Sequence, residues 1–137
     1  MDRELIEQKL ESLRRALQRV SDKCPESVEM LVNDFDAQDI VSLNLTRAVQ
    51  MSVDIGSHLI ACGDYPPPST MGQVFDILAE AEMIDADLAS RLKKAVGFRN
   101  LTVHNYETIN WAIVYAIATE RLIDFKLFAK VVSAIKL

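Results

Sequence analysis

Three residues that could carry out proton transfer or phosphate binding lie close together in the stretch GFRNLTVHNY at 97–106. Arg99 offers a fork of donors that matches phosphate oxygens, and Asn100 offers an amide. His104 brings an imidazole, which both accepts and releases protons near neutral pH. Metal-free RNA cleavage needs a base for the 2′-hydroxyl, an acid for the leaving 5′ oxygen and cations for the developing charge. The stretch could supply this chemistry, although its one histidine gives only one proton-transfer group per chain where cleavage needs two.

The spacing of these residues raises a geometric question. On a helix that turns about 100° per residue, Arg99 and Tyr106 lie within about 20° of one face, and Asn100 and His104 share a face. Arg99 and His104 instead point about 140° apart. A long arginine could reach part of the way, the helix could end or bend near 102–103, or a second copy of the chain could supply the missing group across a two-fold axis. We favour the two-fold axis.

Each residue also has a plainer interpretation. A lone histidine in a helical protein is usually a packed or surface residue, and an arginine is usually an ion-pair partner. Tyr106 could be an amphipathic plug at the end of a helix, and Asn100 or Asn105 could be a capping residue. Residue types and spacing alone therefore leave catalysis undecided.

Length and composition indicate one globular domain over 1–137. Half of the residues are hydrophobic and about a quarter are charged, which is ordinary for a folded protein. No apolar run approaches the ~20 residues of a membrane span, and the charged N-terminal stretch has no signal-peptide core, so we expect a cytoplasmic protein. Cys24 and Cys62 have no metal or redox spacing and are expected to be unpaired thiols.

The distribution of charge is uneven along the chain. The net charge of −5 argues against a general nucleic-acid binder. Residues 88–106, however, carry four cationic side chains and no acid, which leaves −9 for the remainder (−5 − 4). Such a segment could draw a polyanion to one place, but it could equally be a solvated lysine-rich helix face.

Hydrophobic periodicity predicts an all-α, up-and-down bundle of four main helices plus a short fifth. Capping residues mark several starts: Thr70 with Gln73 forms a capping box, and Asp85 and Asn110 precede apolar periodic segments. The connector after Cys24-Pro25 could hold one helical turn, and three prolines at 66–68 form a loop. The expected helices are 2–23, 36–61 (central and most buried), 70–81, 86–103 or slightly beyond, and 110 nearly to the C-terminus.

The motif resembles a known family pattern. Arg99-Asn100-x-x-x-His104 is similar to the R-polar-x(4–6)-H signature of HEPN-domain ribonucleases, and Arg99-x4-His104-x-Tyr106 is similar to the RX4HXY motif of their HepT branch. The chain length, the place of the motif late in the fourth helix, and the segment 42–59 also resemble HepT proteins.

This resemblance implies a function. HepT-like proteins are metal-independent endoribonuclease toxins that act on tRNA or mRNA, in type VII-like HEPN/MNT toxin–antitoxin systems. Arg99 and His104 would be the catalytic pair, and Asn100 the supporting polar residue. Tyr106 would be modified with AMP by a minimal nucleotidyltransferase (MNT) antitoxin, which silences the toxin. The family also implies a homodimer with the active site at its interface, and neither a metal nor a cofactor.

Other residues are harder to assign. Asp54 and His58 lie at i and i+4 and could form a buried hydrogen-bonded pair that orients the motif or braces the bundle. Asp39 could line the cleft, but the sequence gives it no role.

Two other functions stay open. The chain could be a non-catalytic adaptor or substrate-binding subunit of a nucleotidyltransferase, or a dimeric bundle whose motif is inactive. An adaptor has no need for Arg99, His104 and Tyr106 together, so the intact motif favours the ribonuclease.

Overall fold

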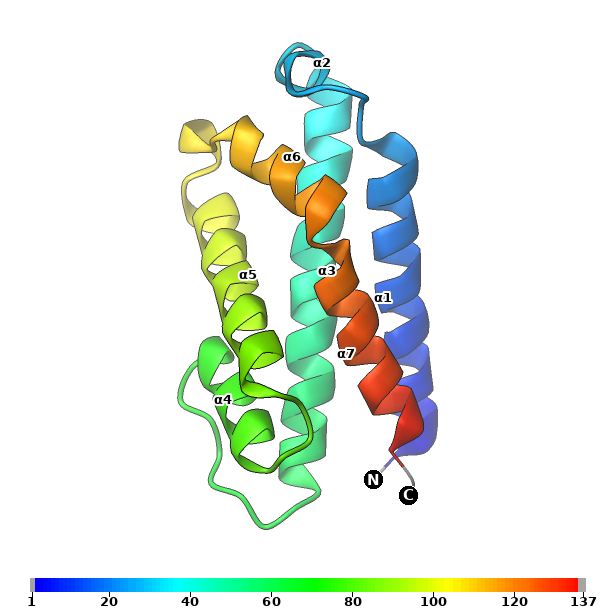
Figure 1. Cartoon of the computed structure of the whole chain (residues 1–137), viewed down its shortest axis with the longest axis vertical. Helices are drawn as coiled ribbons and strands as arrows, with labels where there is room; N and C mark the ends of the chain where they lie inside the picture. Colours follow the sequence, from blue (N-terminus) through cyan, green and yellow to red (C-terminus); the bar gives the residue numbers. More distant parts are fainter. Residues whose placement is uncertain (1, 136–137) are drawn as a thin grey trace.

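The computed structural model describes residues 2–135, and they form an all-α bundle with seven α-helices and one 3-10 turn. The main helices run up, down, up and down (Figure 1), and the start of α1 lies beside the end of α7, where Arg3 Nη1 donates to Ile135 O at 3.3 Å. Within the described residues, no helix is long and apolar enough to cross a membrane. The elements are α1 (Arg3–Lys23), α2 (Val28–Val32), α3 (Phe35–Ala61), α4 (Met71–Glu80), α5 (Ala86–His104), η1 (Tyr106–Thr108), α6 (Trp111–Glu120) and α7 (Leu122–Ala134).

The predicted caps are confirmed. Thr70 Oγ1 accepts a hydrogen bond from the Gln73 amide at 3.2 Å, and the Gln73 side chain accepts one from the Ser69 amide at 2.6 Å. Asp85 accepts from the Leu88 amide at 2.7 Å and Asn110 from the Ala112 amide at 3.0 Å. These side chains satisfy amides that have no partner inside the helix, and so they fix where each helix begins.

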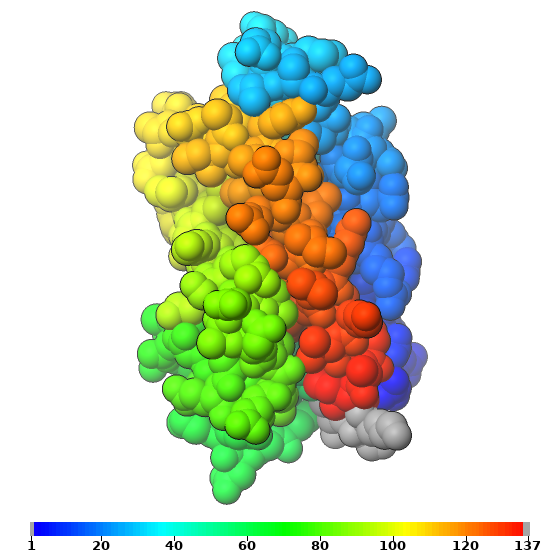
Figure 2. Space-filling view, in the orientation of Figure 1, coloured from blue at the N-terminus to red at the C-terminus, as the bar shows by residue number. Residues whose placement is uncertain are grey.

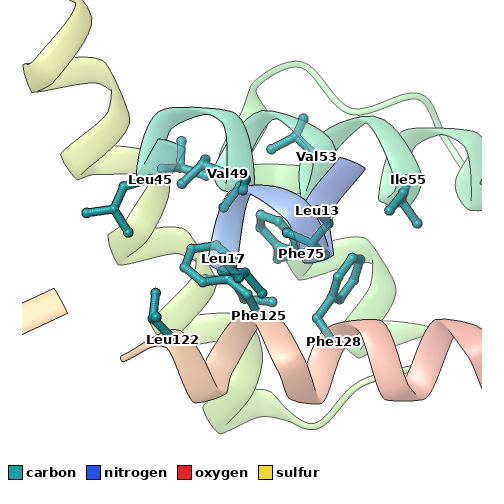
Figure 3. Packing of buried hydrophobic residues seen from close by; sticks show 14 of the residues in the cluster. Leu13, Leu17, Leu45, Val49, Val53, Ile55, Phe75, Leu122, Phe125 and Phe128 are labelled. Atoms are coloured by element: carbon teal, nitrogen blue, oxygen red, sulfur yellow. The ribbon is translucent and has the colours of Figure 1, made fainter. Parts of the chain in front are cut away.

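The central helix is α3, as its apolar circumference predicted, and it contacts each of the other six helices. The core gathers around it, with Phe125 and Phe128 of α7 lying toward Leu13 and Leu17 of α1 (Figure 3). Phe75 and Phe128 meet edge to face with ring centroids 5.9 Å apart. Helix α4 packs on both α3 and α5, which also contact each other, and these two helices carry the candidate site.

The last helix is not continuous, so the prediction of four main helices plus a short fifth was too simple. The helix from 110 divides at Arg121 into α6 and α7. The segment contains no glycine or proline at the break, but α6 packs on α2 while α7 packs on α5. The bend therefore lets one apolar segment cover two differently directed surfaces, as α6 and α7 in front of α3 show (Figure 1).

Candidate active site

Arg99 lies on α5 with its guanidinium held by neutral amides. Nη1 donates to Asn100 Oδ1 at 3.1 Å, and Nη2 donates to Gln50 Oε1 of α3 at 3.4 Å. Nε is buried and has no hydrogen-bond partner in residues 2–135. No carboxylate in this part of the chain forms an ion pair with Arg99. Its positive charge thus remains available to an anion.

Gln50, which the sequence did not single out, is itself fixed by a polar chain. Gln50 Nε2 donates to Asp54 Oδ1 at 2.8 Å, and Asp54 Oδ2 pairs with Lys9 Nζ of α1 at 3.4 Å. These bonds turn the amide oxygen of Gln50 toward Arg99. The i,i+4 spacing of Gln50 and Asp54 was the one available signal, because such pairs face each other on a helix.

The predicted hydrogen bond between Asp54 and His58 does not form. Asp54 is partly exposed and bonded to Gln50 and Lys9, while His58 Nε2 accepts from the Asp2 amide at 3.3 Å. The Gln50 and Lys9 side chains therefore occupy the two oxygens of the Asp54 carboxylate, and His58 instead bonds the residue that caps the start of α1.

His104 is the last residue of α5, and its side chain is exposed. It makes no side-chain hydrogen bond within the described chain. The helix is continuous through Thr102 and closes with the Asn105 amide bonded to Leu101 O at 2.8 Å. A bend near 102–103 is thus excluded, and Arg99 and His104 stay about 140° apart around one helix.

Tyr106 does not lie on α5, so the predicted shared face with Arg99 is wrong. The helix ends at Asn105, whose φ of −140° and ψ of 52° leave the helical region. The Tyr106 hydroxyl instead crosses to α3 and donates to Asp39 Oδ1 at 2.6 Å, while its ring meets Trp111 edge to face. Burial, together with the Asp39 hydrogen bond, raises the pKa of Tyr106 above its ordinary value, so the phenol is neutral at physiological pH.

The cationic segment predicted from residues 88–106 is half neutralised, since two of its four cations form ion pairs. Arg91 Nε pairs with the buried Asp124 at 2.7 Å, and Lys93 pairs with Asp76 at 3.0 Å. Their side chains meet acids from α7 and α4, which the linear sequence places far away. Within residues 2–135, no three His, Cys, Asp or Glu side chains come together as a group that could hold a metal ion.

The motif therefore sits where α5 ends, beside the N-terminal half of α3 and at the end of the molecule where α2 lies (Figures 1 and 2). The model of the family described as "Ribonuclease HepT-like" matches residues 6–132. The chain belongs to the HepT-like ribonuclease family. The resemblance seen in the motif is thereby confirmed over almost the full chain.

Two characterised relatives of this HepT-like chain are named as nucleases. The mRNA nuclease HepT of Shewanella oneidensis is 31% identical over 131 residues, which are 96% of this chain and 98% of that protein. The tRNA nuclease HepT of Aphanizomenon flos-aquae is 23% identical over 130 residues, 95% and 88% of the two chains.

Solved structures agree with the HEPN-like fold. The tri-AMPylated Shewanella oneidensis HEPN toxin, in complex with its MNT antitoxin, has a TM-score of 0.91 and 31% identity, covering 98% of this chain and 100% of that one. The Bacillus subtilis cytosolic protein YutE, at 16% identity and a TM-score of 0.84, covers 98% and 90% and shares the fold.

Proposed function

We propose that this HepT-like chain is a metal-independent endoribonuclease toxin that cleaves cellular RNA, either tRNA or mRNA. The observation that best supports this proposal is the environment of Arg99. This half-buried residue has its guanidinium held in place by two neutral amides, and it is paired with no carboxylate among the described residues. A structural arginine is normally neutralised by an acid, as Arg91 is by Asp124. An oriented cation without an acid is suited to a phosphate.

The active form is a homodimer in which two motifs face each other. His104 of one chain accepts the proton of the RNA 2′-hydroxyl, and the 2′ oxygen attacks the adjacent phosphorus. The imidazolium of the second His104 gives a proton to the 5′ oxygen as the P–O5′ bond breaks, leaving a 2′,3′-cyclic phosphate. Arg99 stabilises the charge on the phosphorane, and Asn100 holds the Arg99 guanidinium.

Tyr106 is the residue through which an MNT antitoxin silences the enzyme. Transfer of AMP from ATP to its hydroxyl, with release of pyrophosphate, would place a bulky anion two residues from His104, where it repels RNA phosphates. The relatives support this regulation, since the Shewanella toxin is AMPylated and bound to an MNT antitoxin.

One gel tests the nuclease assignment. Unmodified protein is incubated with total tRNA and with mRNA in excess EDTA, beside His104→Ala and the matched control His58→Ala. We expect the wild type and His58→Ala to cleave and His104→Ala to lose at least about a hundred-fold in rate, as for a general acid–base group. Equal cleavage by His104→Ala would remove His104 from the mechanism, and silence of the unmodified wild-type dimer on all RNAs would favour the non-catalytic module.

A second experiment tests Tyr106. With the antitoxin and ATP, the wild type should gain the mass of one or more AMP groups and lose activity. Tyr106→Phe should gain no mass and stay active, while Tyr65→Phe, a control at another exposed tyrosine, should behave as the wild type. An adduct on Tyr106→Phe would place the modification at a different residue.

A further inference from the structure

The cations of α1 fall into two groups. Three of them have carboxylate partners at 3.7, 3.4 and 3.0 Å, namely Arg3 with Glu7, Lys9 with Asp54, and Arg14 with Glu11. Arg15, Arg19 and Lys23 form no ion pair within residues 2–135, although the chain contains more acids than bases. Arg15 and Arg19 are at i and i+4, about 6 Å apart along the helix, and so share one face.

That face of α1 borders a groove against α3. The groove has a volume of about 360 Å³ and is lined by Arg15, Arg19 and Arg47, by Ser12 and Asn44, and by two apolar side chains. Arg47 comes from α3 and also has no ion pair in the described chain. Three arginines from two helices therefore line one groove that contains no carboxylate.

Bringing these three arginines together lowers the stability of the fold through electrostatic repulsion. Like charges at i and i+4 destabilise a helix, and a third cation from the facing helix adds to the repulsion. An anion placed in the groove would remove this repulsion. Guanidinium groups and a hydroxyl are donors that suit phosphate oxygens, and successive phosphates of an extended strand could meet Arg15 and Arg19 in turn.

The groove also adjoins the motif. Arg47 and Gln50 are at i and i+3 on α3, where side chains are neighbours, and Gln50 is the residue that binds Arg99. A strand that lies across Arg15, Arg19 and Arg47 thus continues toward Arg99 over the surface of α3.

We propose that the α1–α3 groove of Arg15, Arg19 and Arg47 is a phosphate-backbone binding site that holds the RNA strand beside the cleavage site. The proposal rests on the ribonuclease function proposed above and adds the substrate-binding surface. The site reads charge and not base sequence, because arginine contacts to phosphate carry no base information. It also explains how a protein of net charge −5 can hold a polyanion.

The test compares two triple variants in a His104→Ala background, which binds RNA without cutting it. The groove variant carries Arg15→Gln, Arg19→Gln and Arg47→Gln. The matched control carries Arg121→Gln, Lys126→Gln and Lys130→Gln, which remove the same charge from exposed positions at and along α7. Binding of a fluorescent single-stranded RNA is followed by anisotropy between low and high salt, and circular dichroism melts and size-exclusion chromatography check fold and dimer.

For the groove variant we expect affinity near 0.15 M salt to fall by roughly 10- to 100-fold and the slope of log K against log salt to become less negative by about 2, since three phosphate contacts are lost. The control should keep the wild-type slope. With His104 restored, the groove variant should cleave RNA with a raised KM and an unchanged kcat.

Several outcomes would overturn the proposal. An unchanged slope, or equal losses in both triple variants, would show that Arg15, Arg19 and Arg47 contribute only general charge. Loss of the dimer or of antitoxin binding with RNA affinity intact would assign the groove to a protein contact. If the wild type cleaves RNA and the groove variant binds RNA normally, only the groove proposal fails. A wild type that neither binds nor cuts RNA would contradict the ribonuclease function itself.

Discussion

Asp39 helps to keep the Tyr106 hydroxyl protonated. The carboxylate accepts a hydrogen bond from the phenol at 2.6 Å, and ionisation of Tyr106 would place a second negative charge beside it. Burial also disfavours the phenolate and is the larger cause of the raised pKa. Because this pKa lies above the ordinary value of about 10, the protonated form and its hydrogen bond are fully present at neutral pH and are lost only as pH rises through the raised pKa.

Replacing Asp39 by Asn should therefore lower the pKa of Tyr106, but only part of the way to its ordinary value, because the burial remains. The titration can be followed by NMR of ring-labelled tyrosine, with the Tyr106 signal assigned from Tyr106→Phe. Asp36→Asn, a change at a neighbouring exposed carboxylate on α3, should leave the titration in place. No change with Asp39→Asn would mean that burial alone sets the pKa.

At this scale the sequence singled out candidate residues within 97–106 but not the side chains that hold them. Arg99, Asn100 and His104 were identifiable from residue type and spacing. Gln50 was not identified and Asp39 was given no role, because each contacts the motif across 49 or more positions of the chain. Only the packing of α3 against α5 brings them together.

Among the helices, the first residues were easier to predict than the points at which a helix breaks. Caps at Thr70, Asp85 and Asn110 act through side chains within a few residues, so a local pattern encodes them. The break at Arg121 follows from packing against α2 and α5, and no local residue announces it. The turn at Asn105 likewise removed Tyr106 from the helix on which the spacing had placed it.

The contact of α3 with α4 depends on Gly56. A Cβ at this position would overlap Val74 Cγ1 and lie 3.1 Å from Leu78 Cδ1, and both side chains are buried. Glycine to alanine inside a helix ordinarily stabilises by roughly 0.5–1 kcal/mol, but overpacking costs about 1–3 kcal/mol. We expect Gly56→Ala to lower the free energy of unfolding by about 1 kcal/mol or more.

Urea denaturation would measure this change, with Gly97→Ala as the control. Gly97 also lies inside a helix, but nothing comes within 4 Å of its added Cβ, so this substitution should leave the protein as stable or slightly more stable. If Gly56→Ala matched the control, α4 would have to move away from α3 at little cost.

Over the whole molecule, charge in space differs from charge along the chain. The sequence drew attention to residues 88–106, but two of those cations are paired with Asp124 and Asp76. The cations of the proposed groove, Arg15, Arg19 and Arg47, are spread over 33 positions and converge only in the folded bundle. Ion pairing between helices decides which charges remain for a ligand, and no window of sequence contains that information.

The dimer gives a final prediction, because Arg99 and His104 diverge on one continuous helix. If the two His104 imidazoles of a dimer act together as base and acid, a mixed dimer of one wild-type and one His104→Ala chain lacks one of them. Mixed dimers isolated with two different tags should then lose cleavage about as strongly as the His104→Ala homodimer. If each protomer instead used only its own Arg99 and His104, the mixed dimer would keep about half of the wild-type rate, and that result would rule out the shared site.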